Sequence, residues 1–305
     1  LKIYWMIDLI FGDCLTESDK IKNGSVDLIV TDLPFGTIKN IKNVKHGLSG
    51  KTDWDIVIDT DKVMSIANRI LRKNGKMILF AQQPFTNELI NKSLANLPFN
   101  YSMIWLKDHF ANALTAKKAP LNYYEDILVF SKTHDFEGIH PLRPYFKNVF
   151  EFIALSKKEI IKTIGQRVDH VFRFNSSQFN LCTKQTYDDL IEIYNIDKMD
   201  GFKEYEDILK TTDNLISVFN LWEGGKHKGN VLKYRKDYDG FHPTQKPVLL
   251  LEDLIKTFSK NNDLVVDLTM GSGSTGVACC NTKRNFIGIE KNEEFFNIAQ
   301  QRISQ

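Results

Sequence analysis

Short apolar runs alternate with helical patterns along the first 133 residues of this 305-residue chain. Five runs have the length and the β-branched or aromatic side chains of buried strands, at residues 6–11, 26–31, 76–81, 100–107 and 125–132. Between them, the apolar spacing over 61–73 predicts a helix that ends at a glycine, and 84–96 has a similar pattern. Strands that alternate with helices predict an α/β fold with a doubly wound, mostly parallel sheet.

The pattern changes after residue 133. Four polar-faced helical patterns follow one another without an intervening strand, at residues 156–164, 166–174, 183–196 and 201–210. The earlier alternation returns with a helix at 247–258, a strand at 263–269, a glycine-rich turn, a helix, a strand at 284–290 and a closing helix. We therefore expect one α/β domain in two parts, 1–133 and 240–305, interrupted by a mainly helical insert, 134–239.

Composition narrows the class of protein only slightly. The formal net charge of +2 neither requires nor excludes nucleic acid as a partner. The chain has no apolar run as long as the roughly 18–20 residues of a membrane span, and no secretory signal, so we expect a cytoplasmic protein that does not enter the membrane. Its four cysteines form no Cys-x-x-Cys motif and no histidine pair has zinc spacing, so no metal site is expected.

A glycine-rich turn near the C-terminus is the first candidate for chemistry. The stretch "DLTMGSGSTG" (267–276) lies between a predicted strand and helix, and Glu290 follows Gly271 by 19 residues. Such a turn brings backbone N–H groups close to a ligand, and an acid at that distance suits a ribose diol. A tight turn without a ligand remains the alternative, because this motif alone is a weak signal.

The position of the turn constrains the sheet. Only 29 residues follow Gly276, too few for the rest of a dinucleotide-binding domain. The strands beside this turn must therefore come from the N-terminal half of the chain. A second unusual stretch, "TDLPFGT" (31–37), ends the apolar strand at 26–31. At the topological switch point of a rearranged sheet, the carboxylate and aromatic ring of that stretch would lie beside the glycine turn.

Taken together, the motifs resemble a known family. The ordered set is "GDC" (12–14), "TDLPFGT" (31–37), "WLK" (105–107), "NYYEDILVFSK" (122–132), "HPTQKPVLLLEDLI" (242–255), "DLTMGSGSTGVAC" (267–279) and "FIGIE" (286–290). It is similar to the beta group of S-adenosylmethionine-dependent DNA amino-methyltransferases, in which the catalytic motif precedes the cofactor motif. The resemblance covers about 6–132 and 240–303 and implies a Rossmann-like methyltransferase fold. The segment 134–239 occupies the family's target-recognition position.

The resemblance implies a set of residues that bind S-adenosylmethionine. Asp267 and the turn from Gly271 to Gly273 would hold its methionine part, Glu290 its ribose and Asp13 its adenine amino group. Thr244 and Lys246 would contact its amino-acid end. The full implied set is Asp13, Thr31, Asp32, His242, Thr244, Lys246, Asp267, Gly271, Ser272, Gly273, Ser274, Thr275, Glu290 and Lys291. The chain departs from the family pattern in having Asp267-Leu268-Thr269 where Asp-Pro-Phe is common.

The catalytic motif is implied to be Asp32, Leu33, Pro34 and Phe35, where the family usually has Asp-Pro-Pro-Tyr. The lone pair of an exocyclic amino nitrogen is delocalised into its base. Two acceptors, the Asp32 carboxylate and the Leu33 carbonyl, would localise that pair for in-line attack on the methyl group. Phe35 would stack on the base once it leaves the duplex, although packing in the core is its alternative role.

The target is narrowed by residue type. Methylation at a ring carbon is disfavoured, since no cysteine follows a proline. An aspartate at the first motif position resembles the adenine-N6 enzymes more than the cytosine-N4 enzymes. Cytosine-N4 methylation, an amino group of RNA or protein, and a DNA-binding regulator without turnover remain alternatives.

Double-stranded DNA is the expected partner, and a cognate restriction endonuclease is a possible second one. The protein would be a monomer or a homodimer. Phosphate contacts require lysine and arginine. Candidates lie in the loop after the catalytic motif and in the first two helices of the insert, namely Lys39, Lys42, Lys45, Lys157, Lys158, Arg167 and Arg173. A solvated charged surface is the alternative for both groups.

Overall fold

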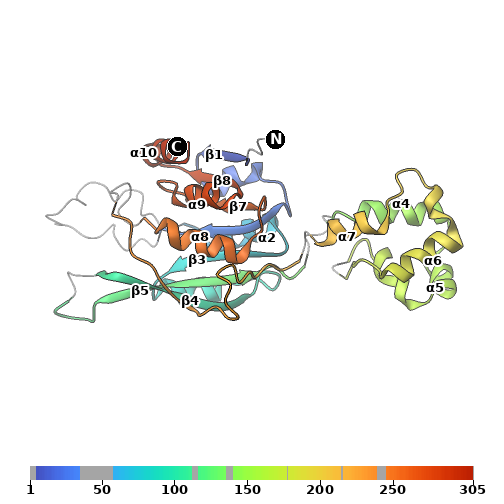
Figure 1. Cartoon of the computed structure of the whole chain (residues 1–305), viewed down its shortest axis with the longest axis horizontal. Coiled ribbons are helices and arrows are strands. Elements are labelled where there is room, and N and C mark those ends of the chain that lie inside the picture. The colour runs from blue at the N-terminus through green and yellow to red at the C-terminus, as the bar shows by residue number, and fades with distance from the viewer. Residues whose placement is uncertain are drawn as a thin grey trace. The chain divides into compact units, whose positions relative to one another are not determined.

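The computed structural model describes residues 5–34, 58–111, 116–134, 140–176, 178–213, 216–238 and 245–304. The chain forms two compact units (Figure 1). One combines Leu1–Thr133 with Val218–Gln305, and the other is His134–Ser217. The two ends of the chain therefore build one unit together, as the return of the strand–helix alternation predicts.

An eight-stranded sheet forms the centre of the first unit in the described residues. Its order is β1 (Ile7–Phe11), β8 (Asn285–Glu290), β7 (Leu264–Asp267), β2 (Val26–Thr31), β3 (Leu71–Ala81), β5 (Asn122–Ser131), β4 (Phe99–Ala111) and β6 (Val231–Lys233). Strands β1, β8, β7, β2 and β3 are parallel, and β6 is parallel to β4. β5 is antiparallel to both β3 and β4, so the sheet is mostly parallel, as expected.

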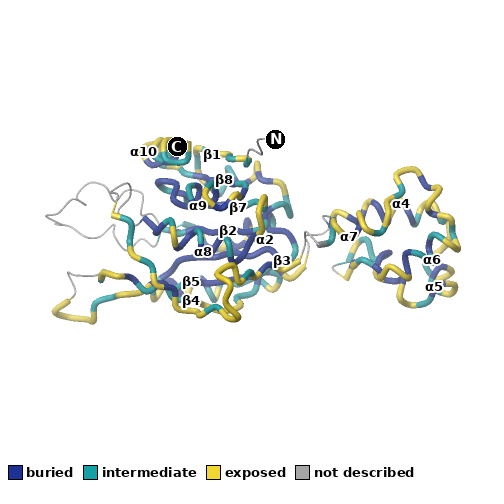
Figure 2. Tube along the Cα trace, in the orientation of Figure 1, coloured by how far each residue is buried: buried dark blue, intermediate teal, exposed yellow. Residues whose placement is uncertain are grey.

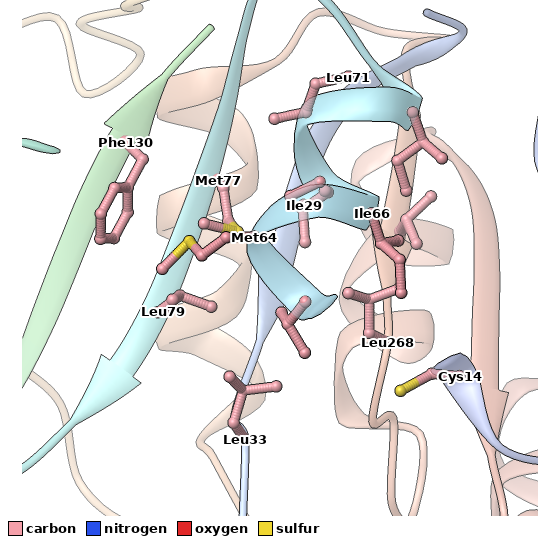
Figure 3. Packing of buried hydrophobic residues seen from close by; sticks show 14 of the residues in the cluster. Cys14, Ile29, Leu33, Met64, Ile66, Leu71, Met77, Leu79, Phe130 and Leu268 are labelled. Carbon is pink, nitrogen blue, oxygen red and sulfur yellow. The ribbon is translucent and has the colours of Figure 1, made fainter. Parts of the chain in front are cut away.

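Helices cover both faces of this sheet. They are α1 (Cys14–Glu17), the 3₁₀ turn η1 (Ser18–Lys20), α2 (Thr60–Ile70), α3 (Phe85–Asn91), α8 (Val248–Phe258), α9 (Ser274–Thr282) and α10 (Glu293–Ile303). Side chains alternate between faces along a strand. Ile29 of β2 packs with α2 in one apolar cluster, which Figure 3 shows from close by, and its neighbours Leu28 and Val30 belong to a second cluster with α8 and α9. Burial on both faces explains why these strands are continuously apolar (Figure 2).

Several predicted boundaries differ from the structure. Helix α2 ends at Ile70 instead of residue 73, because β3 begins at Leu71 and pairs with β2 from Val26 onward. The register then shifts, and Asn74 at a φ of 62° lies within the irregular stretch. The short strand β6 was not predicted, since three residues are too few to show a period.

The second unit is helical in its described residues. It contains α4 (Arg143–Ile153), α5 (Lys157–Ile164), η3 (Gln166–Phe172), α6 (Lys184–Tyr194), η4 (Ile196–Lys198) and α7 (Tyr205–Asp213) around an apolar cluster of its own. Helix α4 was not predicted. The sequence-based boundary of 239 moves to Ser217, because the following residues belong with the first unit. In the first unit, the Asn220 N–H donates to the Thr257 carbonyl over 2.8 Å, and β6 pairs with β4 of the sheet.

Candidate active site

The polar strand ends of the first unit meet at one edge of the sheet. The carboxyl ends of β1, β8, β7, β2 and β3 share this edge because these strands are parallel. β5 runs in the opposite direction, so its first residues and the last residues of β4 reach the same edge. Two crossovers diverge here, from β2 to β3 on one side and from β7 to β8 on the other. This is the topological switch point at which α/β proteins bind ligands.

Direct hydrogen bonds join the catalytic motif to the glycine turn. The Thr269 hydroxyl, just after β7, donates to the Asp32 backbone carbonyl over 2.9 Å. The hydroxyls of Thr31 and Thr269 lie 2.8 Å apart. Residues 237 positions apart in sequence are therefore in direct contact, which is the juxtaposition that the order of the motifs predicts. Thr269, which replaces the family's usual phenylalanine, supplies this link.

The glycine turn is shaped by the helix behind it as well as by its own backbone. Gly271 and Gly273 have φ values of 53° and 83°, which glycine adopts without strain. A Cβ on Gly273 would lie 2.9 Å from the Cβ of Ala299, and one on Gly276 would lie 2.3 Å from Cδ1 of Ile303. Two of the three motif glycines are thus required by the close approach of α10. The motif cannot be taken as a ligand signal at each position.

Arg302 on α10 reinforces the same turn. Its guanidinium donates to the Ser272 carbonyl over 2.7 Å, to the Ser272 hydroxyl over 3.0 Å and to the Ser274 hydroxyl over 3.2 Å. Both serines were predicted to bind the cofactor, whereas Arg302 was not singled out. Its only sequence signal is a charge near the end of the closing helix, and that signal is common to most surface helices.

A buried carboxylate, Asp267, and a half-buried one, Glu290, organise the backbone of the turn. Asp267 accepts hydrogen bonds from the Thr275 hydroxyl at 2.6 Å and the Thr269 N–H at 3.1 Å, and burial raises its pKa to about 6. Glu290 accepts from the N–H groups of Gly271 at 2.9 Å and Asn292 at 2.8 Å, and burial raises its pKa as well.

The adenine end of the predicted cofactor site starts at β1. The Gly12 N–H donates to the Glu290 carbonyl over 2.9 Å, so Asp13 and Glu290 stand at neighbouring strand ends. The Asp13 side chain accepts from the Leu15 N–H over 2.9 Å and caps α1. The charge of Lys291 lowers the pKa of Glu290 and so offsets part of the increase that burial causes. The individual cofactor contacts of these residues stay predictions.

Asp32, whose side chain is 25% exposed, ends a chain of alternating charges whose other three members are buried. Lys107 Nζ lies 2.6 Å from Glu125 Oε1, and Glu125 Oε2 lies 3.3 Å from Lys246 Nζ. Lys246 in turn pairs with Asp32 Oδ2 and lies 5.1 Å from the centre of the Phe80 ring. The side chains of Lys107, Glu125 and Lys246 are 5%, 10% and 8% exposed, so these pairs are shielded from water.

Within the described residues, Asp32 Oδ1 is buried and has no hydrogen-bond partner. Burial raises the pKa of Asp32 to about 6, with the charge of Glu125 adding to the effect and Lys246 opposing it. For Glu125, the two lysines outweigh burial and hold its pKa below the ordinary value. A carboxylate with one fixed oxygen and one unpartnered oxygen is suited to accept a hydrogen bond from a ligand.

Lys107 and Glu125 stand in two motifs of the resembled family, 105–107 and 122–132, but no role was predicted for either residue. The detectable signal was a charged side chain adjoining strongly apolar runs, "MIW" and "ILVF". Lys246 was predicted at the cofactor's amino-acid end, and its observed partners are Asp32 and Glu125. Leu33 is buried among the core residues around α2, and Pro34 is half-buried. Six predicted residues lie outside the described ones, namely Phe35, Lys39, Lys42, Lys45, His242 and Thr244.

Three of the four predicted DNA contacts in the second unit are paired with acids. Lys157 lies 2.5 Å from Asp169, to which Arg173 also binds, and Arg167 pairs with Asp189. Lys158 is exposed on α5. These acids reduce the local positive charge, and the DNA contacts of all four residues stay predictions.

The described residues contain neither a candidate membrane-spanning helix nor a candidate metal-binding group. None of their helices combines the length and the apolar character of a bilayer span. They also contain no group of three or more histidine, cysteine or acidic side chains that could hold a metal ion.

Comparison with known proteins identifies the family of this chain. The chain is 28% identical over 302 residues to DNA adenine methyltransferase YhdJ of Escherichia coli, covering 97% of this chain and 82% of that protein. It is 23% identical to the type II methyltransferase M.HindIII of Haemophilus influenzae, covering 98% and 96%. The crystal structure of the M1.HpyAVI–SAM complex has the same fold, with a TM-score of 0.55, 19% identity and coverage of 98% and 100%. The family model described as "DNA methylase" matches residues 26–301, and the chain belongs to that family.

Proposed function

We propose that this protein transfers a methyl group from S-adenosylmethionine to the exocyclic N6 amino group of an adenine that has left the DNA duplex. One observation carries the proposal: Asp32, a half-buried carboxylate whose buried Oδ1 has no partner among the described residues, is hydrogen-bonded through its backbone to the glycine turn after β7. Asp32, the proposed acceptor for the amino group, therefore lies beside the glycine turn, the proposed binding site of the methyl donor.

The residues of the glycine turn fit such a donor. The turn stands at a switch point with Asp267 and Glu290 at adjacent strand ends. Each carboxylate oxygen has more than one acceptor position, so the contacts made within the protein leave capacity for the ligand's amino and hydroxyl groups. The bound donor would supply an electrophilic methyl on a sulfonium. The chain's own residues would hold that donor in line with the amino nitrogen, a positioning effect worth up to roughly 7–11 kcal/mol.

Asp32 and the Leu33 carbonyl would accept the two hydrogens of the amino group. Localising the nitrogen lone pair in this way requires an ionised Asp32. As the methyl group is transferred, the nitrogen becomes positively charged and loses a proton, which Asp32 can accept and pass to water. No covalent intermediate with the protein is needed.

Adenine is favoured over cytosine by two observations. The motif begins with aspartate, as in the adenine enzymes of the resembled family, and YhdJ is named as a DNA adenine methyltransferase. The similarity to the type II methyltransferase M.HindIII suggests a restriction endonuclease as a partner. We assign recognition of duplex DNA to the helical unit 134–217. Modification of cellular DNA and free cysteines in the described residues both suit the cytoplasm.

Nucleoside analysis by mass spectrometry tests the proposal. Purified protein is incubated with duplex DNA and S-adenosylmethionine that carries a deuterated methyl group, and the DNA is then digested. We expect labelled N6-methyladenine with the wild type and none with Asp32→Ala. Labelled N4-methylcytosine would show that the target base is wrong. Label in RNA or protein only, or in no substrate while the donor still binds, would reject the proposed function.

A further inference from the structure

The four charges of the ion-pair chain, three of them buried, come from four different segments. Lys107 ends the buried part of β4, Glu125 lies near the start of β5, Lys246 precedes α8 and Asp32 follows β2. Their signs alternate, so the chain has no net charge when all four groups are ionised. Burying charged groups costs several kcal/mol each unless they are well paired. A fold that needed these strands only for packing would be served as well by apolar side chains.

The pairing divides the two oxygens of Asp32 between two tasks. Oδ2 is bound to Lys246, whereas Oδ1 has no partner among the described residues. Rotation about the last bond of an aspartate side chain is weakly restricted. The ion pair with Lys246 therefore fixes which oxygen is left without a partner in the described residues.

Lys246 can do this only if it is held in place itself. Its ammonium lies between Asp32 and Glu125 and over the ring of Phe80. Glu125 is in turn fixed by Lys107 and by the Gln82 amide, whose nitrogen lies 3.3 Å from Glu125 Oε1. Lys107, Glu125 and Lys246 thus contact one another in that order, and the last of them contacts Asp32. The position of Asp32 therefore depends on two residues of the sheet, Lys107 and Glu125.

We propose that Glu125 and Lys107 are positioning residues for methyl transfer, which act through Lys246 to keep one Asp32 oxygen directed at the amino group. The proposal rests on the proposed function for the reaction itself. The geometry of the ion-pair chain stands independently of which base is methylated.

The chain also sets the charge around Asp32. The ionisable groups that interact with Asp32 are Lys246, Glu125, Lys107 and Asp267, and Lys236 after β6 interacts with the same lysines and with Glu125. The negative charge of Glu125 raises the pKa of Asp32, and the positive charge of Lys107 lowers it. Removing either charge leaves the other unbalanced. The two substitutions should therefore move the ionisation of Asp32 in opposite directions.

The test compares Glu125→Gln with Lys107→Met in single-turnover methylation of duplex DNA across pH. Both variants should lower the single-turnover rate constant at saturating DNA by about 10- to 100-fold, with smaller changes in the apparent affinity for DNA, because misplacement of a reacting group has an effect of this size. The acid limb of the rate profile should move to lower pH in Glu125→Gln and to higher pH in Lys107→Met. A matched control is the pair Glu252→Gln and Lys256→Met on α8, whose charges lie 3.4 Å apart and should leave the profile unchanged.

A second measurement separates this proposal from the proposed function. The carboxyl carbon of Asp32, followed by NMR in protein labelled with ¹³C-aspartate and assigned with Asp32→Asn, reports its ionisation without any turnover. Opposite shifts of the titration in the two variants support positioning even if no DNA base is methylated. Unchanged titrations, or shifts in one direction in both variants, would overturn the positioning role even if the wild type is active. If one variant fails to fold, the direction of the shift in the other decides.

Discussion

Two neighbouring strand ends carry the same residue type but use it differently. Asp267 is the last residue of β7 and Asp32 follows β2, and burial raises the pKa of each to about 6. Both oxygens of Asp267 accept hydrogen bonds from its own turn, at Thr269 and Thr275. Asp32 has one oxygen on Lys246 and one without a partner in the described residues. The raised pKa therefore does not distinguish these two aspartates, whereas the oxygen without a partner does.

The difference follows from what stands behind each carboxylate. The turn after β7 is folded around Asp267, and α10 packs on that turn closely enough to require glycine at two positions. Asp32 is held by Lys246, which precedes α8, and its second oxygen has no partner in the described residues. At the end of β7 both carboxylate oxygens have partners, whereas after β2 only one of the two has a partner in the described residues. Substitutions at the two positions should separate binding from chemistry.

The largest effect is expected from Asp32→Ala. Loss of the acceptor for the amino group should reduce the methylation rate by on the order of 1,000-fold, the range seen when one preorganised polar group is removed from an active site. S-adenosylhomocysteine should still bind, because the glycine turn keeps its own hydrogen bonds. Calorimetry and single-turnover kinetics on the same sample check both parts. A parallel loss of affinity would show that Asp32 serves the cofactor site instead.

Asp267→Ala should give the opposite pattern. It leaves the Thr269 N–H and the Thr275 hydroxyl without their acceptor, and buried hydrogen bonds to a charged group contribute about 1.5–3 kcal/mol each. We expect a free energy of unfolding lower by about 2–3 kcal/mol, since the relief from burying a charge offsets part of the loss. Affinity for S-adenosylhomocysteine should fall by at least about tenfold, as about 1.4 kcal/mol of lost binding would produce. Denaturant titration and calorimetry measure the two quantities, and an unchanged affinity would break the comparison.

Much of this arrangement can be predicted from the sequence, because it depends on order along the chain. The apolar runs at 26–31 and 284–290 correspond to β2 and β8, since strands buried on both faces need continuous apolar residues. The motif order, with the glycine turn so near the C-terminus, requires strands from both ends of the chain to be neighbours. β2 does lie beside β7. Proximity of Asp32 to the turn follows from that topology.

The groups that support the site could not be predicted in this way. Lys107 and Glu125 become partners only because β4 and β5 pair in one particular register, in which Trp105 lies opposite Glu125. Arg302 reaches Ser272 only because α10 folds back over the turn. Such contacts join elements that are distant in sequence and leave no local period. The end of the helical unit at Ser217 was missed for the same reason, since pairing of β6 with β4 decides it.

The smallest effect is expected from Gly276→Ala, which is also the most specific test of why the turn needs glycine. The new Cβ would lie 2.3 Å from Cδ1 of Ile303 and 2.9 Å from Cε1 of Phe286, so side chains must shift. Overpacking of this kind costs about 1–3 kcal/mol, which thermal or denaturant unfolding would detect. The direct contact predicts a rescue: Ile303→Ala removes the closest atoms, and the double variant should be more stable than the sum of the two single changes.

Stability and function should separate in this pair of variants. If glycine at position 276 serves the packing of α10, the double variant should also regain affinity for S-adenosylhomocysteine, because the turn returns to its original path. Additive losses of stability would contradict the packing explanation. Recovered stability without recovered affinity would show instead that the ligand itself needs the space at Gly276. The shape of the glycine turn would then be required by cofactor binding as well as by the packing of α10.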